Sequence, residues 1–305
     1  MTRSQLIIAA VFVAAWFGLK DVVYRSIFPG KTASEQIAAT YNGDDGWAVM
    51  PVEPPPGAWL EPWGIDLYII PPPSGAAAGK GLIGAFHTKA ADEMTKHAHQ
   101  IEKALAPSGP SYSPIYRHPS ASIRPQANSW DVAHDDIAIA FERYLYTKNN
   151  MRGILLVSSP ETQEFVAPIL ARIEADPRLL ERFSGVVWLQ KNATPPNMEV
   201  NCSPVMMGNC DVVGTVQNTS SWLRWVLPQL PRKSVRFKIS EPEKLAKKLT
   251  ERNTKLSLWL DENAPKPAEP LGGIDDIEIV GVAPIRRPGE TDEALADEGT
   301  AGQAD

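Results

Sequence analysis

Four short apolar runs, separated by segments with helical periodicity, constrain the fold of this chain more than any other feature of its sequence. Within residues 88–106, Met94, Ala98 and Ile101 recur at helical spacing, and residues 131–148 show a similar pattern. Strands that alternate with helices of this length favour an α/β fold, in which a mostly parallel sheet has helices on both faces. The predicted strands are Ile65–Ile70, residues 81–86, Gly153–Ser158 and residues 185–189, with residues 277–283 as a further candidate.

Charge and residue content exclude several classes of function. The chain has 305 residues and a formal net charge of −6, whereas a nucleic-acid binder normally presents a basic surface. Its two cysteines are too few for a zinc site built from cysteines alone. The sequence contains no glycine-rich phosphate loop. We therefore expect no nucleic-acid partner, no metal and no cofactor.

The first 24 residues are typical of a membrane anchor. Arg3 is followed by an apolar run from Leu6 to Leu19, which as a helix spans roughly 21 Å. Extending the run to Tyr24, with Lys20 reaching toward the lipid headgroups, gives about the 20 residues that a membrane span needs. A cleaved signal peptide and a buried core helix remain as alternatives. The positive-inside bias places Arg3 in the cytoplasm and the bulk of the chain on the other side of the membrane.

Cys202 and Cys210 flank a short segment that contains turn residues. Pro204 and Gly208 lie between them, so the segment can fold back and bring the two sulfur atoms together. A disulfide is the expected state in an oxidising compartment, whereas two buried thiols in a cytosolic protein are the alternative. The predicted anchor favours the disulfide. A metal site at this pair lacks further ligands, because no histidine follows His134.

Composition divides the chain into four parts. Residues 1–24 form the predicted anchor, and residues 25–62 form a proline-rich spacer that leads into the domain and partly packs on it. The predicted domain spans residues 63–262. Residues 263–305 form a C-terminal extension whose acidic tail carries no basic residue beyond Arg287, which is typical of disorder.

Several short motifs around the strand that ends at Ser158 occur in an order that resembles a bacterial family. They are residues 66–71, Ser113-Pro114-Ile115-Tyr116-Arg117, residues 136–145 and the loop from Cys202 to Cys210. Over roughly residues 60–225 the chain resembles an α/β-hydrolase-like family known only as domain of unknown function three-zero-eight-nine. The resemblance implies an α/β-hydrolase-like fold, in which a nucleophile follows a strand at a sharp turn.

The residues after this strand depart from that family at the nucleophile. Where the family has Gly-His-Ser-Gln-Gly, this chain has Ser158-Ser159-Pro160-Glu161-Thr162, here called the elbow segment, with Pro160 at the nucleophile position. A nucleophile elbow needs a strained backbone, which a proline ring locked at a φ of about −65° cannot adopt. We therefore predict that Ser159 caps a helix whose first residue is Pro160, with Glu161 near its positive end. A nucleophile shifted to Ser158 or Ser159 is the alternative.

The positions of the histidines lead to the same interpretation. All five precede Ser159, whereas the histidine of an α/β-hydrolase follows the nucleophile along the chain. We therefore predict a pseudo-hydrolase, which is a non-catalytic binding or scaffolding protein with an envelope protein as its partner. Residues 6–24 are expected to anchor it in the bacterial inner membrane, with its bulk in the periplasm. The alternative is an active serine hydrolase or esterase that uses Ser158 or Ser159 with an early histidine close in space.

Three consecutive residues upstream of the elbow segment form a candidate pocket. Tyr116, Arg117 and His118 lie between prolines, and the guanidinium of Arg117 is suited to binding an anion. A structural salt bridge at Arg117 is the alternative.

Two further charged segments have an ordinary structural explanation beside a functional one. His134-Asp135-Asp136 suggests a metal or acid–base cluster, but a solvated helix start explains the same residues. Residues 232–255 carry nine basic and three acidic side chains. An amphipathic helix with Leu245 and Leu249 on one side accounts for this segment, and a surface for anionic lipid or an acidic partner is the alternative.

Overall fold

The described part of the chain is a mixed α/β domain. The computed structural model describes residues 38–60, 62–74, 82–119, 129–192, 194–218 and 237–268. All of these described residues belong to one compact unit. The predicted anchor, the candidate strand at residues 277–283 and the acidic tail lie outside the described residues. Within these described ranges, no helix is long and apolar enough to cross a membrane.

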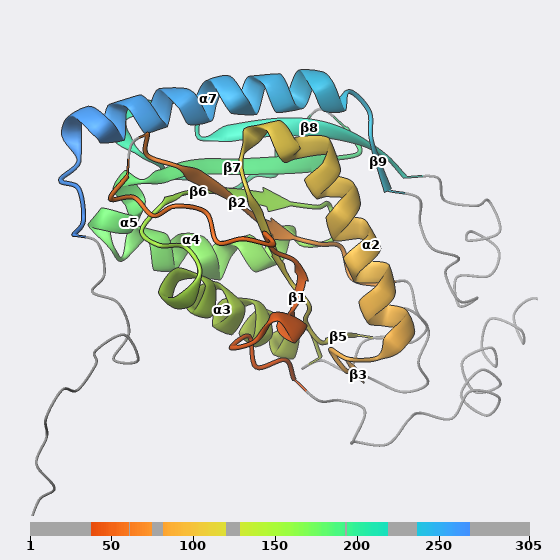
Figure 1. Cartoon of the computed structure of the whole chain (residues 1–305). Coiled ribbons are helices and arrows are strands. Elements are labelled where there is room, and N and C mark those ends of the chain that lie inside the picture. The colour runs from red at the N-terminus through yellow and green to blue at the C-terminus, as the bar shows by residue number, and fades with distance from the viewer. Residues whose placement is uncertain are drawn as a thin grey trace, which may run out of the picture. The chain divides into compact units, whose positions relative to one another are not determined.

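A seven-stranded sheet forms the centre of the domain (Figure 1). The two edge strands, β1 and β9, pair antiparallel with their neighbours, and the four pairings between the other strands are parallel. In spatial order the strands are β1 (Trp47–Val49), β4 (Ser111–Pro114), β2 (Ile65–Ile70), β6 (Gly153–Ser158), β7 (Phe183–Gln190), β8 (Asp211–Asn218) and β9 (Phe237–Ile239). This mostly parallel sheet fits the α/β-hydrolase-like fold that the sequence predicted.

Helices cover both faces of the sheet, as the alternation of strands and helices predicted. Helix α2 (Thr88–Leu105) packs beside α7 (Pro242–Asn263), and α3 (Ser129–Thr147) packs beside α4 (Val166–Glu174) (Figure 1). A short helix, α5 (Pro177–Glu181), leads into β7. Short 3₁₀ helices complete the fold: η2 (Asp44–Gly46), η3 (Ala106–Ser108), η4 (Gln163–Phe165) and η5 (Pro204–Met206).

Several strands differ from what the sequence predicted, and β4, β8 and β9 were not predicted at all. The run at residues 81–86 yields only β3 (Leu82–Ile83), which pairs antiparallel with β5 (His118–Pro119) in a separate two-stranded sheet. Conversely, β1 lies in the part of the chain predicted as a spacer, where it forms an edge of the main sheet. An edge strand tolerates the prolines that follow it, because its outer N–H groups need no partner strand.

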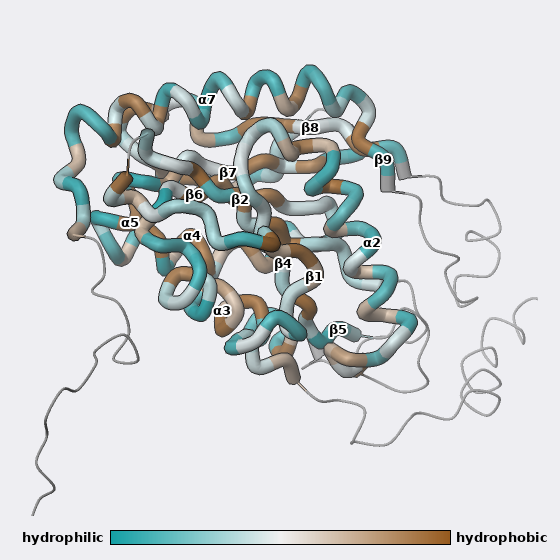
Figure 2. Tube along the Cα trace, viewed as in Figure 1, coloured by the Kyte–Doolittle hydropathy of each residue, from teal (hydrophilic) through white to brown (hydrophobic). Residues whose placement is uncertain are grey.

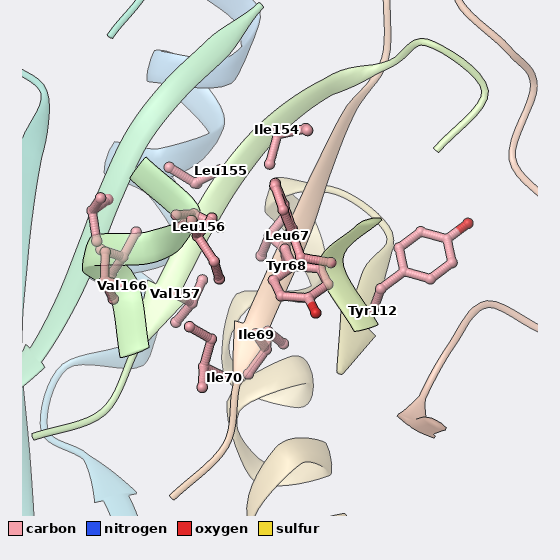
Figure 3. Close-up of a cluster of buried hydrophobic side chains, with 14 of the residues drawn as sticks. Leu67, Tyr68, Ile69, Ile70, Tyr112, Ile154, Leu155, Leu156, Val157 and Val166 are labelled. Atoms are coloured by element: carbon pink, nitrogen blue, oxygen red, sulfur yellow. The ribbon is translucent and has the colours of Figure 1, made fainter. Parts of the chain in front are cut away.

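The core is centred on β2 and β6, whose six residues each are all buried. Figure 3 shows the side chains of Leu67, Tyr68 and Ile69 beside those of Leu156 and Val157. The ring of Tyr68 lies 5.0 Å from that of Phe141 and 5.1 Å from that of Tyr144, both on α3. Figure 2 shows hydrophobic residues gathered in the strands and hydrophilic ones along much of α2 and α7. Truncating one of these buried aliphatic side chains to alanine costs about 2–5 kcal/mol.

A buried polar network joins the amino ends of β2 and β6. Arg152 donates from Nε to Asp66 Oδ1 at 2.5 Å, and its Nη1 donates to the carbonyl of Pro56. The other carboxylate oxygen of Asp66 accepts from the hydroxyl of Tyr144 at 2.9 Å and from the amide of Asn149 at 3.1 Å. Burial raises the pKa of Asp66 above its ordinary value, and the bonds from Arg152, Tyr144 and Asn149 offset part of that rise by stabilising the carboxylate. The network fixes the end of the sheet that lies opposite the elbow segment.

Helix α7 connects the C-terminal part of the domain to its first strands. The backbone N–H of Trp63 donates to Asp261 Oδ1 at 3.2 Å across 198 residues of sequence. Ser108 donates from Oγ to the carbonyl of Ala246 at 3.2 Å, and Asn253 donates to the carbonyl of Ser108 at 2.7 Å. The buried side of α7 includes Leu245 and Leu249, as predicted from the sequence. The domain is therefore complete only when α7 is in place.

Candidate functional site

The elbow segment lies at the point where the sheet reverses its strand order. Ile70 at the end of β2 pairs with Ser158 at the end of β6, so the two strands finish side by side. From β2 the chain continues to β4 on one side, and from β6 it continues to β7 on the other. In open α/β sheets, ligands bind outside the carboxyl ends of the strands at such a switch point. The chain therefore places its elbow segment where this class of fold holds a site.

Thr162 organises the hydroxyl groups of the elbow segment. Its Oγ1 accepts from the backbone N–H of Ser159 at 3.0 Å and lies 2.9 Å from Ser159 Oγ and 3.1 Å from Ser158 Oγ. The same oxygen lies 3.3 Å from the carbonyl of Ile70, so it also ties β2 to β6. Ser158, Ser159 and Thr162 are fully buried. Both candidate nucleophiles are thus hydrogen-bonded within their own turn.

The predicted helix start at Ser159 and Pro160 is wrong. Residues 159–162 form a turn, closed by a hydrogen bond from the N–H of Thr162 to the carbonyl of Ser159, and α4 begins only at Val166, after η4. The physical reason is that a proline φ of about −65° suits the second position of a β-turn as well as the first turn of a helix. The described non-glycine residues with positive φ are Tyr41, Asn150 and Met151, so the elbow segment carries no such strain.

Arg117 forms a structural salt bridge, which was the alternative to anion binding. Its Nε donates to Asp136 Oδ2 at 2.9 Å and its Nη2 donates to Asp136 Oδ1 at 2.6 Å, while its backbone N–H donates to Oδ2 at 3.0 Å. These bonds raise the pKa of the Arg117 guanidinium above its ordinary value. Since both guanidinium contacts go to one buried carboxylate, the geometry does not support an anion site at Arg117.

The segment His134-Asp135-Asp136 is neither a metal cluster nor a solvated helix start. Asp136 is buried against Arg117, two turns into α3. The ring of His134 packs edge-on against that of Phe165, with the ring centres 4.8 Å apart. Among the residues that the structure describes, no group of three or more histidine, cysteine, aspartate or glutamate side chains is placed to hold a metal ion.

A hydrogen-bonded pair that the sequence did not reveal lies at the same end of the sheet. Ser74, four residues beyond β2, has its Oγ 3.0 Å from Nε2 of His118. The other ring nitrogen of His118, Nδ1, lies 3.0 Å from the carbonyl oxygen of Pro119. Burial lowers the pKa of His118 to about 4, so its imidazole is neutral at neutral pH. The sequence offered one clue to this pair, which is that Ser74 follows a predicted strand and so lies near the carboxyl edge of the sheet.

Tyr116 packs against both His118 and Phe165, the last residue of η4. Its ring centre is 6.2 Å from that of His118 and 5.8 Å from that of Phe165. Its hydroxyl donates to the carbonyl of Pro71 at 2.6 Å. Burial raises the pKa of Tyr116 well above its ordinary value, and the nearby carboxylate of Glu161 raises it further. The structure therefore brings Tyr116, His118 and the elbow segment to one edge, while Arg117 is engaged with α3.

The predicted disulfide between Cys202 and Cys210 is confirmed. It lies between β7 and β8, next to the amino end of β8, and thus at the edge opposite the elbow segment. Gly185 has a φ of 116°, and a Cβ at this position would come within 2.0 Å of the carbonyl oxygen of Cys210. Only glycine allows the disulfide loop to approach β7 so closely. The disulfide is therefore structural and takes no part in the candidate site.

Two surface grooves occur elsewhere on the described part of the domain. One, of about 520 Å³, lies between α3 and α4 and is lined by Ile139, Tyr146 and Arg172 among others. The second, of about 690 Å³, lies where β8 and β9 meet α7, and its lining includes Lys244 and Lys248. Neither groove is lined by the elbow segment or by the Ser74–His118 pair.

Comparisons with known proteins identify no family for this chain. No family model matches it, so the resemblance to the family of unknown function stays a prediction. No curated protein matches it either. Among solved structures, it is similar to a hormone-sensitive lipase from a metagenome library, with 16% sequence identity and a TM-score of 0.27. That match covers 61% of this chain and 56% of the lipase chain.

Proposed function

We propose that this chain is a membrane-anchored protein of the bacterial envelope whose α/β-hydrolase-like domain acts by binding or scaffolding and is catalytically silent at its elbow segment. The observation that carries the proposal is the turn at residues 159–162. There, the hydroxyl groups of Ser158 and Ser159 are buried and lie within hydrogen-bond distance of Thr162 Oγ1.

The chemistry of acyl transfer explains why this geometry is unsuited to catalysis. The reaction needs an exposed nucleophile, a base within about 3 Å and N–H groups directed at the developing oxyanion. Pro160 lacks the N–H that would follow a nucleophile at Ser159. Among the described residues, neither Ser158 nor Ser159 is hydrogen-bonded to a histidine. A serine hydrolase that uses these two residues is therefore the weaker candidate.

The proposal of an envelope location rests on two features. Residues 6–24 have the composition of a signal anchor, and the disulfide between Cys202 and Cys210 suits an oxidising compartment. A fusion of alkaline phosphatase to the C-terminus should be active, and a fluorescent protein that matures only in the cytoplasm should stay dark. The reverse result would overturn both the orientation and the location.

Labelling with a fluorophosphonate tests whether the elbow segment lacks a reactive serine. We expect no label at Ser158 or Ser159 when the full chain is treated in detergent micelles. The matched variant Ser158→Ala plus Ser159→Ala should keep every protein that co-purifies with the intact chain from cross-linked membranes. Label at either serine, or loss of those proteins from the double variant, would show that the elbow segment is a working site.

A further inference from the structure

Strand β8 is longer than the strand that covers its outer edge. It spans eight residues, Asp211–Asn218, whereas β9 has three and pairs only with Val216–Asn218. The N–H of Ser240 adds one more bond, to the carbonyl of Thr215, before the chain turns into α7. Among the described residues, no backbone segment pairs with the outer side of residues 211–214. In this part of the chain, the first half of β8 is therefore an open strand edge.

The open edge presents backbone groups that have no neighbouring strand among the described residues. The carbonyl of Cys210 accepts from the N–H of Val186, so it points toward β7. The carbonyl of Thr215 accepts from Ser240, so it points to the opposite side. Because successive residues of a strand bond to alternate sides, Val213 directs its N–H and C=O groups outward, as Thr215 does. Such groups are a template for pairing with another extended segment.

A groove of about 690 Å³, here called the edge groove, lies along this part of β8. Residues 213–215 line one side of it and the first turns of α7 line the other, with the end of β9 between them. Figure 1 shows α7 beside β8, with β9 next to the start of the helix. Beyond the other end of the open edge, the guanidinium of Arg252 donates to the carbonyls of Asn209 and Cys210. The open edge at residues 211–214 thus matches about 13 Å of extended chain.

Lysine side chains make the edge groove attractive to an acidic segment. Lys244, Lys247 and Lys248 line it, together with two glutamates. Lys244 pairs with Glu241 at 3.2 Å, and Lys247 pairs with Glu251 at 4.0 Å. Both ion pairs are exposed, and exposed pairs contribute little to stability. Lys248 forms no ion pair with another described residue. Carboxylates of a bound segment can therefore replace the two exposed pairs and also reach Lys248.

We propose that the edge groove binds an extended, acidic segment of another envelope protein by strand addition to β8. The segment lies beside residues 211–214, and its backbone pairs with the N–H and C=O groups of Val213. Its alternate side chains point toward the lysines of α7, where carboxylates distinguish it from neutral segments. This inference rests on the proposed binding function, to which it adds the surface and the chemistry of the partner.

Two other occupants fit the edge groove less well. A lipid headgroup would meet the lysines but would leave the outward backbone groups of Val213 without partners. A second copy of this chain, paired through β8 of both copies, would bring the lysines of two α7 helices together. Like charges that face one another across paired strands are destabilising. An acidic segment from a different protein satisfies both the backbone and the charge.

Binding of a short synthetic peptide tests the assignment. The probe is a fluorescein-labelled peptide in which glutamate and valine alternate, added to the full chain in detergent micelles, and fluorescence polarisation measures the binding. N-methylation of every second peptide amide should abolish binding, because a methylated amide cannot donate a hydrogen bond to the strand edge. Exchange of the glutamates for lysines should abolish it as well. Hydrogen exchange should show that the bound peptide protects the amides of residues 211–215.

Variants of the edge groove separate strand addition from attraction by charge alone. Val213→Pro removes an outward N–H but no bond to β7, so it should weaken binding about three- to tenfold. Lys248→Glu should weaken binding by a similar factor. Lys255→Glu makes the same charge change at an exposed position of α7 outside the edge groove and should bind like the wild-type chain. Thermal unfolding shows whether each variant is folded, and the N-methylated peptide tests strand addition even if Val213→Pro is not.

Several results would overturn the inference. Equal binding of the methylated and unmodified peptides, or equal effects of Lys248→Glu and Lys255→Glu, would show attraction by charge alone. Binding of phosphatidylglycerol vesicles in place of the peptide would assign the edge groove to lipid. If the wild-type chain binds neither probe, the inference fails but the proposed function stands, because labelling at Ser158 and Ser159 tests that function separately.

Discussion

The hydroxyl oxygens of Ser159 and Thr162 lie 2.9 Å apart inside a single turn of the chain. Ser159 precedes Pro160, and the Oγ1 of Thr162 lies within hydrogen-bond distance of Ser158 at the end of β6 and of the carbonyl of Ile70 at the end of the neighbouring strand β2. The residues that follow the central strand therefore use their polar groups to close the turn. In an active hydrolase the same position would present a hydroxyl to solvent.

Replacing Thr162 with alanine should destabilise the domain without creating activity. The change removes the acceptor for the N–H of Ser159 and the partner of two buried hydroxyl groups. Leaving buried polar groups without partners lowers the free energy of unfolding by about 1–3 kcal/mol. Urea denaturation monitored by tryptophan fluorescence measures the loss. Thr162→Ser, which keeps the hydroxyl, is the matched control and should lose much less. Equal stability of the two variants would contradict the role assigned to Thr162.

Breaking the buried ion pair of Asp66 and Arg152 should cost far more than breaking an exposed one. Arg152→Met leaves the carboxylate of Asp66 buried without its charged partner, which should lower the free energy of unfolding by about 3–5 kcal/mol. Arg172→Met removes the exposed pair with Glu142 and should cost about 0–1 kcal/mol. Thermal and urea unfolding of both variants measure the difference. Similar costs would show that the network around Asp66 adapts to the loss.

The low pKa of His118 predicts a specific dependence of stability on pH. The folded chain holds this pKa at about 4, below the 6.5 of a free histidine, so the unfolded chain binds the proton first as the pH falls. The free energy of unfolding is therefore unaffected by His118 above pH 6.5. It falls by about 3 kcal/mol as the pH drops from 6.5 to 4, because only the unfolded chain is protonated in this range. His118→Gln should lack this loss. We expect the two unfolding free energies to diverge with pH over this window, and parallel curves would refute the prediction.

Removing the disulfide should weaken the domain without disturbing the elbow segment. Cys202 and Cys210 are eight residues apart, and opening so short a loop costs about 2–3 kcal/mol in the chain-entropy model. The double variant Cys202→Ser plus Cys210→Ser should show this loss in urea, and the wild-type chain should show it only after reduction. Mass spectrometry of alkylated, non-reduced protein should find both cysteines unlabelled. Two alkylated cysteines would disprove the bond.

The central strands were predictable because their signal is local. Each of β2 and β6 is a run of six residues buried on both faces, and α2 and α3 show their periodicity over five turns. Strand β1 was not predictable, because its three residues pair with β4 more than sixty residues away. The register between β1 and β4 depends on packing between distant segments, which no local sequence pattern reveals.

The candidate site was only partly predictable for related reasons. Pro160 fits a helix start and a β-turn equally well, and the choice of the turn depends on the bond from Thr162 to the distant strand β2. Arg117 meets Asp136 on a helix that begins well after it, and Ser74 meets His118 across 44 residues. The sequence identified the residue types, but the topology of the sheet decided which of them meet.

The hydrogen bond between Trp63 and Asp261 also determines when the domain can be completed during translation. A ribosome that adds about 5–20 residues per second needs about 10–40 s to cover the 198 residues between these partners. Throughout that interval α2 and β7 are being synthesised or already exist, while α7, which packs against both, is not yet complete. Nascent chains of this protein must therefore pass through a period in which apolar surface is open to chaperones, proteases and other nascent chains.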